Sequence, residues 1–291
     1  SYQGFEAQKL HLLFQATYYL NSGNYKSAIR YYQELINLFN DNQHLILNPP
    51  IYYLSAIQGI LDSLCIAGLY HETPFFLSKL EELTQNEYST EFILHLKTLI
   101  YIYQSNSLLQ AGNFEQALEL RDKQENELLK KVTSLGLESQ LRLYLSFAVL
   151  GMYTKDYVQA RKYMKKIFSL GKLFCAFPSY KIARLVNLLL QAELGNYDFF
   201  ENEIISIKRN IRFEKQTYIT EKLIFKFIQG YPLPSYEKAR NKRWLQYQKD
   251  IQKIEQDKYE RQLLKTFDVL AWIESKLTQR SLADIFAEKA H

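Results

Sequence analysis

The chain has 291 residues, of which 47% are hydrophobic and 23% charged, so it can bury the core of one large domain or two ordinary ones and is not a disordered tail. Its 10 Gly and 6 Pro are few for this length, a composition that favours helices over a turn-rich β-sandwich. The net charge of +5 belongs to residues 201–265, where fifteen Lys and Arg accompany nine Asp and Glu, and no segment has the roughly 18 consecutive apolar residues of a membrane span.

The spacing of apolar residues and the breaks between them predict helices along the whole chain, arranged as successive pairs. Breaks at residues 48–50, 136 and 177–179 separate the pairs, and the Gly-Tyr-Pro-Leu-Pro segment at 230–234 is the strongest of them. The expected pairs are 3–21 with 24–39, 51–67 with 71–85, 90–111 with 113–134, 137–153 with 156–170, and 179–194 with 196–210, followed by a single helix at 215–229.

The turn inside each pair has a recurring sequence, which first occurs in residues 20–32, LNSGNYKSAIRYY. Related segments are AGLYHETP at 67–74, AGNFEQALEL at 111–120, TKDYVQARKY at 154–163 and LGNYDFF at 194–200. The turn positions are 45, 44, 43 and 40 residues apart and are occupied by Gly23, Gly68, Gly112, Lys155 and Gly195. A period of this size with glycine at its centre indicates stacked helix hairpins, whose turns use the left-handed backbone conformation.

The other residues of the repeated turn also have structural roles. Four polar residues are expected to cap the second helix of each pair, namely Asn24, Asn113, Asp156 and Asn196. Aromatic residues two positions after the turn are expected to fill the space between pairs, namely Tyr25, Tyr70, Phe114, Tyr157 and Tyr197. Small residues recur twelve positions apart, where they allow two helices to approach closely: Ala16 and Ala28, Ser105 and Ala117, and Ala148 and Ala160.

This arrangement of small, glycine and aromatic residues resembles the tetratricopeptide repeat over residues 5–210. The period exceeds the roughly 34 residues of that family, so each helix has about one extra turn, as in its longer-helix relatives, which include uncharacterised bacterial helical-repeat proteins. The resemblance implies an all-α fold, an α-α superhelix of about five to six helix hairpins, with a concave ligand groove lined by the first helix of each pair.

The character of the sequence changes after residue 234. Residues 235–265 form a long, highly charged helical stretch, residues 267–277 predict a short amphipathic helix, and residues 281–284 predict the cap of a final helix. We therefore expect tetratricopeptide-like repeats in residues 1–230 and C-terminal helices in residues 235–291. A repeat array exposes apolar surface at its ends, so the C-terminal helices are interpreted as a cap, with an interaction module as the alternative.

No residue pattern indicates catalysis or a bound metal. Glu91 and His95 are four residues apart on one helix face, but no second pair of this kind accompanies them. There is no GxSxG motif, and Cys65 and Cys175 lie in apolar segments that suggest buried side chains and a reducing compartment. The sequence therefore predicts a non-enzymatic, cytoplasmic protein without a cofactor or metal.

The resemblance also assigns the positions that line the groove. They are Leu13, Thr17, Asn21, Gln58, Asp62, Ile66, Ile102, Asn106, Gln110, Leu145, Val149 and Tyr153. Some family members clamp a peptide's terminal carboxylate with lysines, which are absent here because Leu13, Gln58 and Ile102 occupy those positions. The predicted peptide- or protein-binding residues are Thr17, Asn21, Gln58, Asp62, Asn106, Gln110 and Tyr153. The side-chain amides among them, at Asn21, Gln58, Asn106 and Gln110, can pair with the backbone of an extended peptide.

The leading functional hypothesis is a scaffold or adaptor that binds a protein or peptide through this groove. One alternative is the sensor part of a larger protein, as in the bacterial peptide-pheromone receptors that the repeats also resemble. The other is nucleic-acid binding through the basic residues Lys238, Arg240, Lys242 and Arg243, with stacking of bases on Trp244. Acidic residues follow at once, so a solvated face of mixed charge is the competing interpretation of that helix.

Overall fold

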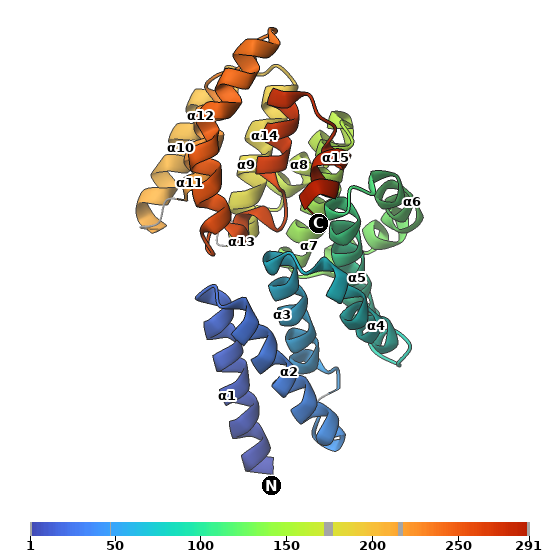
Figure 1. The fold of residues 1–291 in the computed structure, drawn as a ribbon. Coiled ribbons are helices and arrows are strands. Elements are labelled where there is room, and N and C mark those ends of the chain that lie inside the picture. The colour runs from blue at the N-terminus through green and yellow to red at the C-terminus, as the bar shows by residue number, and fades with distance from the viewer. Residues whose placement is uncertain (1, 47, 172–176, 215–217, 290–291) are drawn as a thin grey trace. The chain divides into compact units, whose positions relative to one another are not determined.

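The computed structural model describes residues 2–46, 48–171, 177–214 and 218–289, and all regular elements in these ranges are helical (Figure 1). The all-α prediction is therefore confirmed for the described residues. The helices are α1 (Tyr2–Asn21), α2 (Tyr25–Asp41), α3 (Ile51–Ala67), α4 (Thr73–Leu83), α5 (Thr90–Gln110), α6 (Phe114–Lys130), α7 (Leu137–Tyr153), α8 (Tyr157–Ser169), α9 (Pro178–Glu193), α10 (Phe199–Glu214), α11 (Ile219–Ile228), α12 (Glu237–Gln256), α13 (Arg261–Leu264), α14 (Val269–Thr278) and α15 (Leu282–Lys289).

The chain divides into two compact units, Ser1–Ser107 and Leu108–His291. In the first unit α1 packs on α2, α2 on α3, and α3 on α4, so consecutive helices form the expected hairpins. In the second unit the same succession runs from α6 through α10. Residues 235–291 belong to this second unit, where α12 packs on α11 and α14, and α14 packs on α15.

The five predicted turns all have the left-handed backbone conformation. The φ angles are 73° at Gly23, 77° at Gly68, 73° at Gly112, 61° at Lys155 and 74° at Gly195. Lys155 adopts this conformation although its Cβ makes it unfavourable by about 1 kcal/mol, so the turn is maintained by the packing of α7 on α8. The small residues predicted at the helix contacts are completely buried, namely Ala16, Ala28, Ser105, Ala117, Ala148 and Ala160.

Two of the four predicted helix caps are confirmed. The Asn24 side chain accepts a hydrogen bond from the Ser27 N–H at 3.2 Å, and that of Asp156 from the Gln159 N–H at 3.1 Å. Asn113 occupies the predicted N-cap position of α6, but its side chain makes no cap bond. The prediction for Asn196 is wrong, because Asn196 precedes α10 by three residues and instead donates to the Gln191 side chain at 2.7 Å. Of the turn aromatics, Tyr25 is buried as expected, whereas Tyr197 is 41% exposed.

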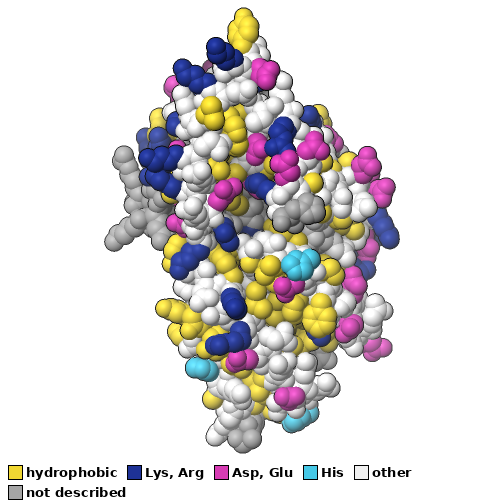
Figure 2. All heavy atoms as spheres, viewed as in Figure 1, with side chains coloured by type: hydrophobic (Ala, Val, Ile, Leu, Met, Phe, Trp, Pro, Cys, Tyr) yellow, Lys and Arg dark blue, Asp and Glu magenta, His cyan; other side chains and the backbone are white. Residues whose placement is uncertain are grey.

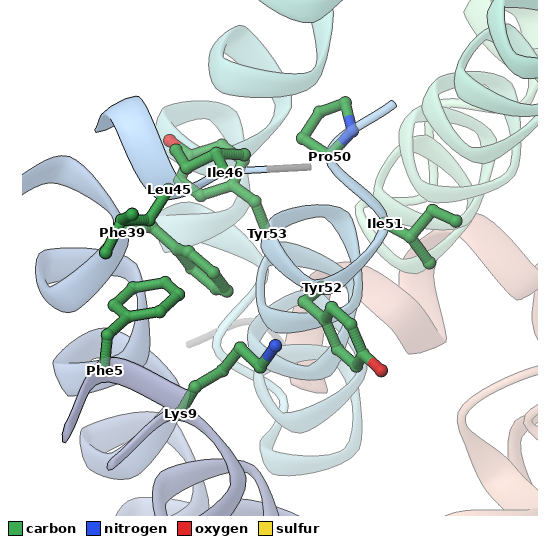
Figure 3. Close-up of a pocket in the computed structure, with 9 residues that line it drawn as sticks. All are labelled: Phe5, Lys9, Phe39, Leu45, Ile46, Pro50, Ile51, Tyr52 and Tyr53. Atoms are coloured by element: carbon green, nitrogen blue, oxygen red, sulfur yellow. The ribbon is translucent and has the colours of Figure 1, made fainter. Parts of the chain in front are cut away.

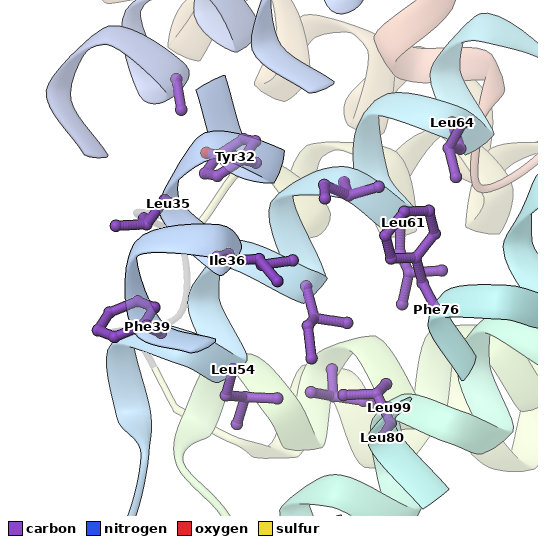
Figure 4. Packing of buried hydrophobic residues seen from close by; sticks show 14 of the residues in the cluster. Tyr32, Leu35, Ile36, Phe39, Leu54, Leu61, Leu64, Phe76, Leu80 and Leu99 are labelled. Carbon is purple, nitrogen blue, oxygen red and sulfur yellow. The ribbon is translucent and has the colours of Figure 1, made fainter. Parts of the chain in front are cut away.

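The core of the first unit lies between α2, α3 and α4, with a contribution from α5 (Figure 4). Tyr32, Leu35 and Ile36 of α2 face α3 and are at most 4% exposed. On α3 the buried positions cover most of the helix circumference, and only one narrow face reaches solvent. The side chains on that face are therefore the ones through which α3 can meet another molecule.

The C-terminal helices are shorter than predicted, and α12 ends at Gln256 rather than continuing to residue 265. Asp257 ends it, because its carboxylate accepts the N–H groups of Tyr259 and Glu260 and thereby favours a turn. The turn brings the Glu260 carboxylate to the start of α11, where it accepts the Ile219 N–H and, at 3.0 Å, the Thr220 N–H. The predicted cap at residues 281–284 is confirmed, since the Asp284 N–H donates to the Ser281 hydroxyl at 3.1 Å.

A buried polar cluster ties α14 to the hairpins of the second unit. The Glu193 carboxylate at the end of α9 accepts hydrogen bonds from the Tyr157 hydroxyl at 2.5 Å and the Tyr231 hydroxyl at 3.1 Å. The Lys276 ammonium on α14 donates to the same carboxylate at 2.5 Å. One carboxylate thus connects α8, α9, α14 and the segment after α11, which is the arrangement expected of a packed structural cap.

Candidate protein-binding face

Residues from four helices of the first unit meet around the Tyr32 hydroxyl and the Asp62 carboxylate. This hydroxyl is hydrogen-bonded to Thr17 of α1 and interacts electrostatically with the Asp62 carboxylate of α3. The Tyr103 hydroxyl of α5 donates to the same carboxylate at 3.0 Å and lies 3.5 Å from the Gln58 carbonyl oxygen. The structure therefore brings together Thr17, Gln58 and Asp62, three of the predicted binding residues.

The position of Tyr32 depends on a glycine in the middle of α3. A methyl group at Gly59 would lie within 2.6 Å of three atoms of the Tyr32 ring, whereas carbon atoms pack at roughly 3.5–4.0 Å. The absence of a side chain at Gly59 therefore allows the ring to lie directly on the α3 backbone. This contact sends the Tyr32 hydroxyl toward Thr17 and Asp62.

Burial keeps Tyr32 protonated. Removal of the hydroxyl from water raises its pKa above the ordinary value of 10.0 and is the largest effect. The hydrogen bond with Thr17 lowers the pKa, and the neighbouring Asp62 carboxylate raises it by a smaller effect. The net shift is upward, so the Tyr32 hydroxyl is neutral at neutral pH.

An exposed apolar stripe on α1 lies beside these polar residues. Leu10, Phe14 and Tyr18 are 54%, 67% and 57% exposed, and their spacing of four residues places them along one side of the helix. Thr17 and Asn21, both exposed, adjoin the stripe. We call the surface formed by this stripe with Thr17, Asn21, Gln58 and Asp62 the α1–α3 face.

The α1–α3 face is almost without charge. Residues 10–25 contain no Asp, Glu, Lys or Arg, and Asp62 is the only such residue in the sequence of α3. The prediction from sequence missed Leu10, Phe14 and Tyr18, although their spacing and the absence of charge around them were visible. An exposed, uncharged and aromatic surface is the composition found at the centres of protein interfaces.

The remaining predicted binding residues lie elsewhere. Asn106 is half-buried on α5 in the first unit, and Gln110, also half-buried, is in the second. Tyr153 is only 3% exposed, so its assignment to an open groove is corrected. Its ring stacks on Phe267 at 5.0 Å between ring centroids, and its hydroxyl accepts the Asp268 N–H at 2.6 Å. The C-terminal helices thus cover the α7 position that the repeat phase assigned to a ligand.

The predicted anionic-partner patch is also corrected, because two of its four residues serve the fold. The Arg240 guanidinium is 7% exposed and donates to the Pro234 and Ser235 carbonyl oxygens at 3.1 and 2.5 Å. Arg243 donates to the Gly230 carbonyl oxygen at 2.8 Å. Only Lys238 and Lys242 remain exposed. Figure 2 shows Lys and Arg side chains over the part of the second unit that contains α12, with Asp and Glu side chains among them.

A small apolar pocket in the first unit is a second candidate site (Figure 3). It is lined by Phe5, Lys9, Phe39, Leu45, Ile46, Pro50, Ile51, Tyr52 and Tyr53. Its space, including the open mouth, is about 210 Å³, below the roughly 300–1,000 Å³ of ordinary ligand pockets. The Lys9 ammonium lies 4.2 Å from the Tyr52 ring centroid and is paired with Glu6 at 2.7 Å, so it already joins α1 to α3. These contacts indicate a structural role.

No constellation for metal binding is found in the described part of the chain, where no three His, Cys, Asp or Glu residues come together. Glu91 is exposed at the start of α5, and Cys65 is a buried free thiol. Cys175 lies outside the described residues. In those same residues no helix is long and apolar enough to cross a bilayer.

Comparisons of the chain with protein-family models, with curated proteins and with solved structures find no significant match.

Proposed function

We propose that this chain is a non-enzymatic, cytoplasmic scaffold or adaptor, built from tetratricopeptide-like helix hairpins, that binds a protein or peptide through the α1–α3 face. The observation that carries the proposal is the exposed, uncharged stripe of Leu10, Phe14 and Tyr18 beside Thr17, Asn21 and Asp62. Aromatic side chains supply large contact area at low entropic cost, and the adjacent polar groups supply direction and specificity.

The polar residues of the face suit a polypeptide ligand. Asn21 and Gln58 each present an amide with both donors and acceptors, which can pair with the N–H and C=O groups of a peptide backbone. The hydroxyls of Tyr32 and Tyr103 hold the surrounding helices in register around Asp62. A rigid face of this kind loses little entropy when a ligand binds.

The proposal is tested by capture of partners from a cell lysate with the full chain as bait, followed by mass spectrometry. A second bait has Asn21→Ala and Gln58→Ala, both on the α1–α3 face. A matched control bait has Asn202→Ala and Gln246→Ala, two exposed amides on α10 and α12. We expect the wild-type and control baits to capture a protein that the second bait does not capture. A partner that all three baits retain equally would place the binding site elsewhere, and recovery of nucleic acid alone would favour the basic helix.

A further inference from the structure

In the second unit, an amphipathic helix of this chain covers the end of α7, which is the repeat equivalent of α1. Tyr153 precedes the turn residue Lys155 by two positions, as Asn21 precedes Gly23. The Tyr153 ring packs edge-on against Phe286 of α15, with ring centroids 5.5 Å apart. The surface at the end of α7 that corresponds to the Asn21 end of α1 is therefore occupied by a helix.

The helix that occupies this surface has a simple pattern. Leu282, Ile285 and Phe286 of α15 are its buried residues, at relative positions i, i+3 and i+4. Lys289, at i+7, pairs its ammonium with the Asp268 carboxylate at 2.7 Å. α15 is thus an amphipathic helix with three apolar anchors and one basic side chain that meets an acidic residue.

The α1–α3 face offers the same chemistry. Leu10, Phe14 and Tyr18 are exposed along α1, and the half-buried Asp62 supplies one carboxylate beside them. Their spacing of four residues forms a ridge that fits the groove between the side-chain rows of another helix. The face therefore combines apolar side chains with one carboxylate, as the contacts of α15 do in the second unit, where the carboxylate belongs to Asp268 at the start of α14.

We propose that the α1–α3 face binds an amphipathic helix of a partner protein that carries apolar residues at i, i+3 and i+4 and a basic residue directed at Asp62. This inference rests on the proposed function and specifies the partner's chemistry. Association of helices in this way is an established mode of recognition, in which apolar anchors provide affinity and charges provide orientation.

A second copy of the same chain fits this face less well. The α1 segment from residue 10 to residue 21 has no cation with which a partner copy would meet Asp62. The exposed stripe amounts to roughly 350 Å², taking about 200 Å² for each fully exposed side chain, which is less than half of the about 800 Å² per partner in a standard interface. A partner helix with a Lys or Arg can in addition pair with the Asp62 carboxylate of α3, whereas residues 10–21 of a second copy have no Lys or Arg for this.

The test is selection from a display library of random 16-residue peptides against the full-length chain. The counter-selection uses the Phe14→Ser, Tyr18→Ser variant, and the matched control is Phe75→Ser, which removes an aromatic residue of α4 that is 60% exposed. We expect enriched sequences with apolar residues three and four positions apart and a Lys or Arg. A synthetic peptide of this kind should bind at least about tenfold more weakly to the double variant and unchanged to the control.

Two further variants separate the possible outcomes. A proline in the centre of the peptide should abolish binding, because it breaks a helix but is tolerated by an extended chain. Asp62→Asn should remove the preference for the basic peptide over its Gln version, by roughly threefold to tenfold. Proline-tolerant peptides that require Asn21 and Gln58 would overturn the helix inference and leave the proposed function standing. Absence of any enriched peptide would refute both, and a wild-type dimer lost in the double variant would identify a second copy as the occupant.

Discussion

Replacement of Gly59 by alanine should destabilise the first unit, although alanine is the better helix former. Gly59 lies in the interior of α3, where this change alone stabilises a helix by about 1 kcal/mol. Here the new methyl group would lie within 2.6 Å of three Tyr32 ring atoms, so the ring would have to move by roughly 1 Å to restore normal packing. Tyr32 is only 4% exposed, so its ring cannot simply turn out into solvent.

The net effect follows from the difference between these two contributions. Overpacking of a filled core costs about 1–3 kcal/mol, and the upper part of that range applies because backbone, buried ring and hydroxyl contact would all be disturbed. We therefore expect Gly59→Ala to lower the free energy of unfolding of the first unit by about 2 kcal/mol, measured by urea denaturation monitored by circular dichroism and tyrosine fluorescence. The ligand face should also be altered, since Tyr32 positions its hydroxyl beside Thr17 and Asp62.

The control is Gly136→Ala, where an added methyl group meets no atom within 4 Å and φ is −58°. Because Gly136 is the N-cap of α7 and alanine is a poorer cap, stability should fall by no more than about 1 kcal/mol. Tyr32→Leu should relieve the overlap, and the Gly59→Ala, Tyr32→Leu pair should be less destabilised than the sum of the two single changes. An increase in stability of about 1 kcal/mol for Gly59→Ala would refute the reasoning, because it would show that Tyr32 does not confine this position.

Three further predictions concern the second unit. Glu193→Ala should lower its stability by about 3 kcal/mol in urea denaturation, because it leaves one ammonium and two hydroxyls without their acceptor. Burial, reinforced by Glu193, raises the pKa of Tyr157 and Tyr231 above 10.0, so the unfolded chain loses these protons at lower pH than the folded chain. The free energy of unfolding should therefore be unaffected by these groups below pH 10 and should decrease as the pH rises above 10. The decrease should be smaller in the Tyr157→Phe, Tyr231→Phe variant. Arg240→Ala should lower the free energy of unfolding by about 2 kcal/mol, and Lys238→Ala should lower it by less than about 0.5 kcal/mol. Equal losses in the two variants would contradict the structural role of Arg240.

The burial of Tyr153 changes how the second unit is understood. Its aromatic contacts with Phe267 and Phe286 make the C-terminal helices part of the packed unit. This agrees with the interpretation of residues 235–291 as a cap. The same contacts leave the first unit as the place where an equivalent face of a first helix is open.

Local sequence signals predicted the elements and their turns well. The bounds of α7 agree with the expected 137–153, and all five turn positions have positive φ. These features depend on short-range physics, namely helix periodicity, the left-handed conformation after a helix and the need for small residues where helices touch. The predicted cap at Asn196 failed because α10 begins three residues later, at Phe199. Asn113 has φ −85° and ψ 61°, close to the −92° and 73° of Asn24, and nothing in the structure explains why only Asn24 of the two makes a side-chain cap bond.

The amino-acid sequence alone determined the all-helical class, the hairpin period and the burial of the small residues, because each follows from interactions within about one repeat. Only the tertiary structure decided which polar residues face solvent. Arg240 was predicted to lie in an exposed basic patch and Tyr153 in an open groove, but contacts from other elements bury both residues. No sequence pattern assigned a role to Leu10, Phe14 and Tyr18, which are exposed because the described chain packs α1 mainly on α2. Exposure depends on which surfaces meet, and that depends on residues far apart in the chain.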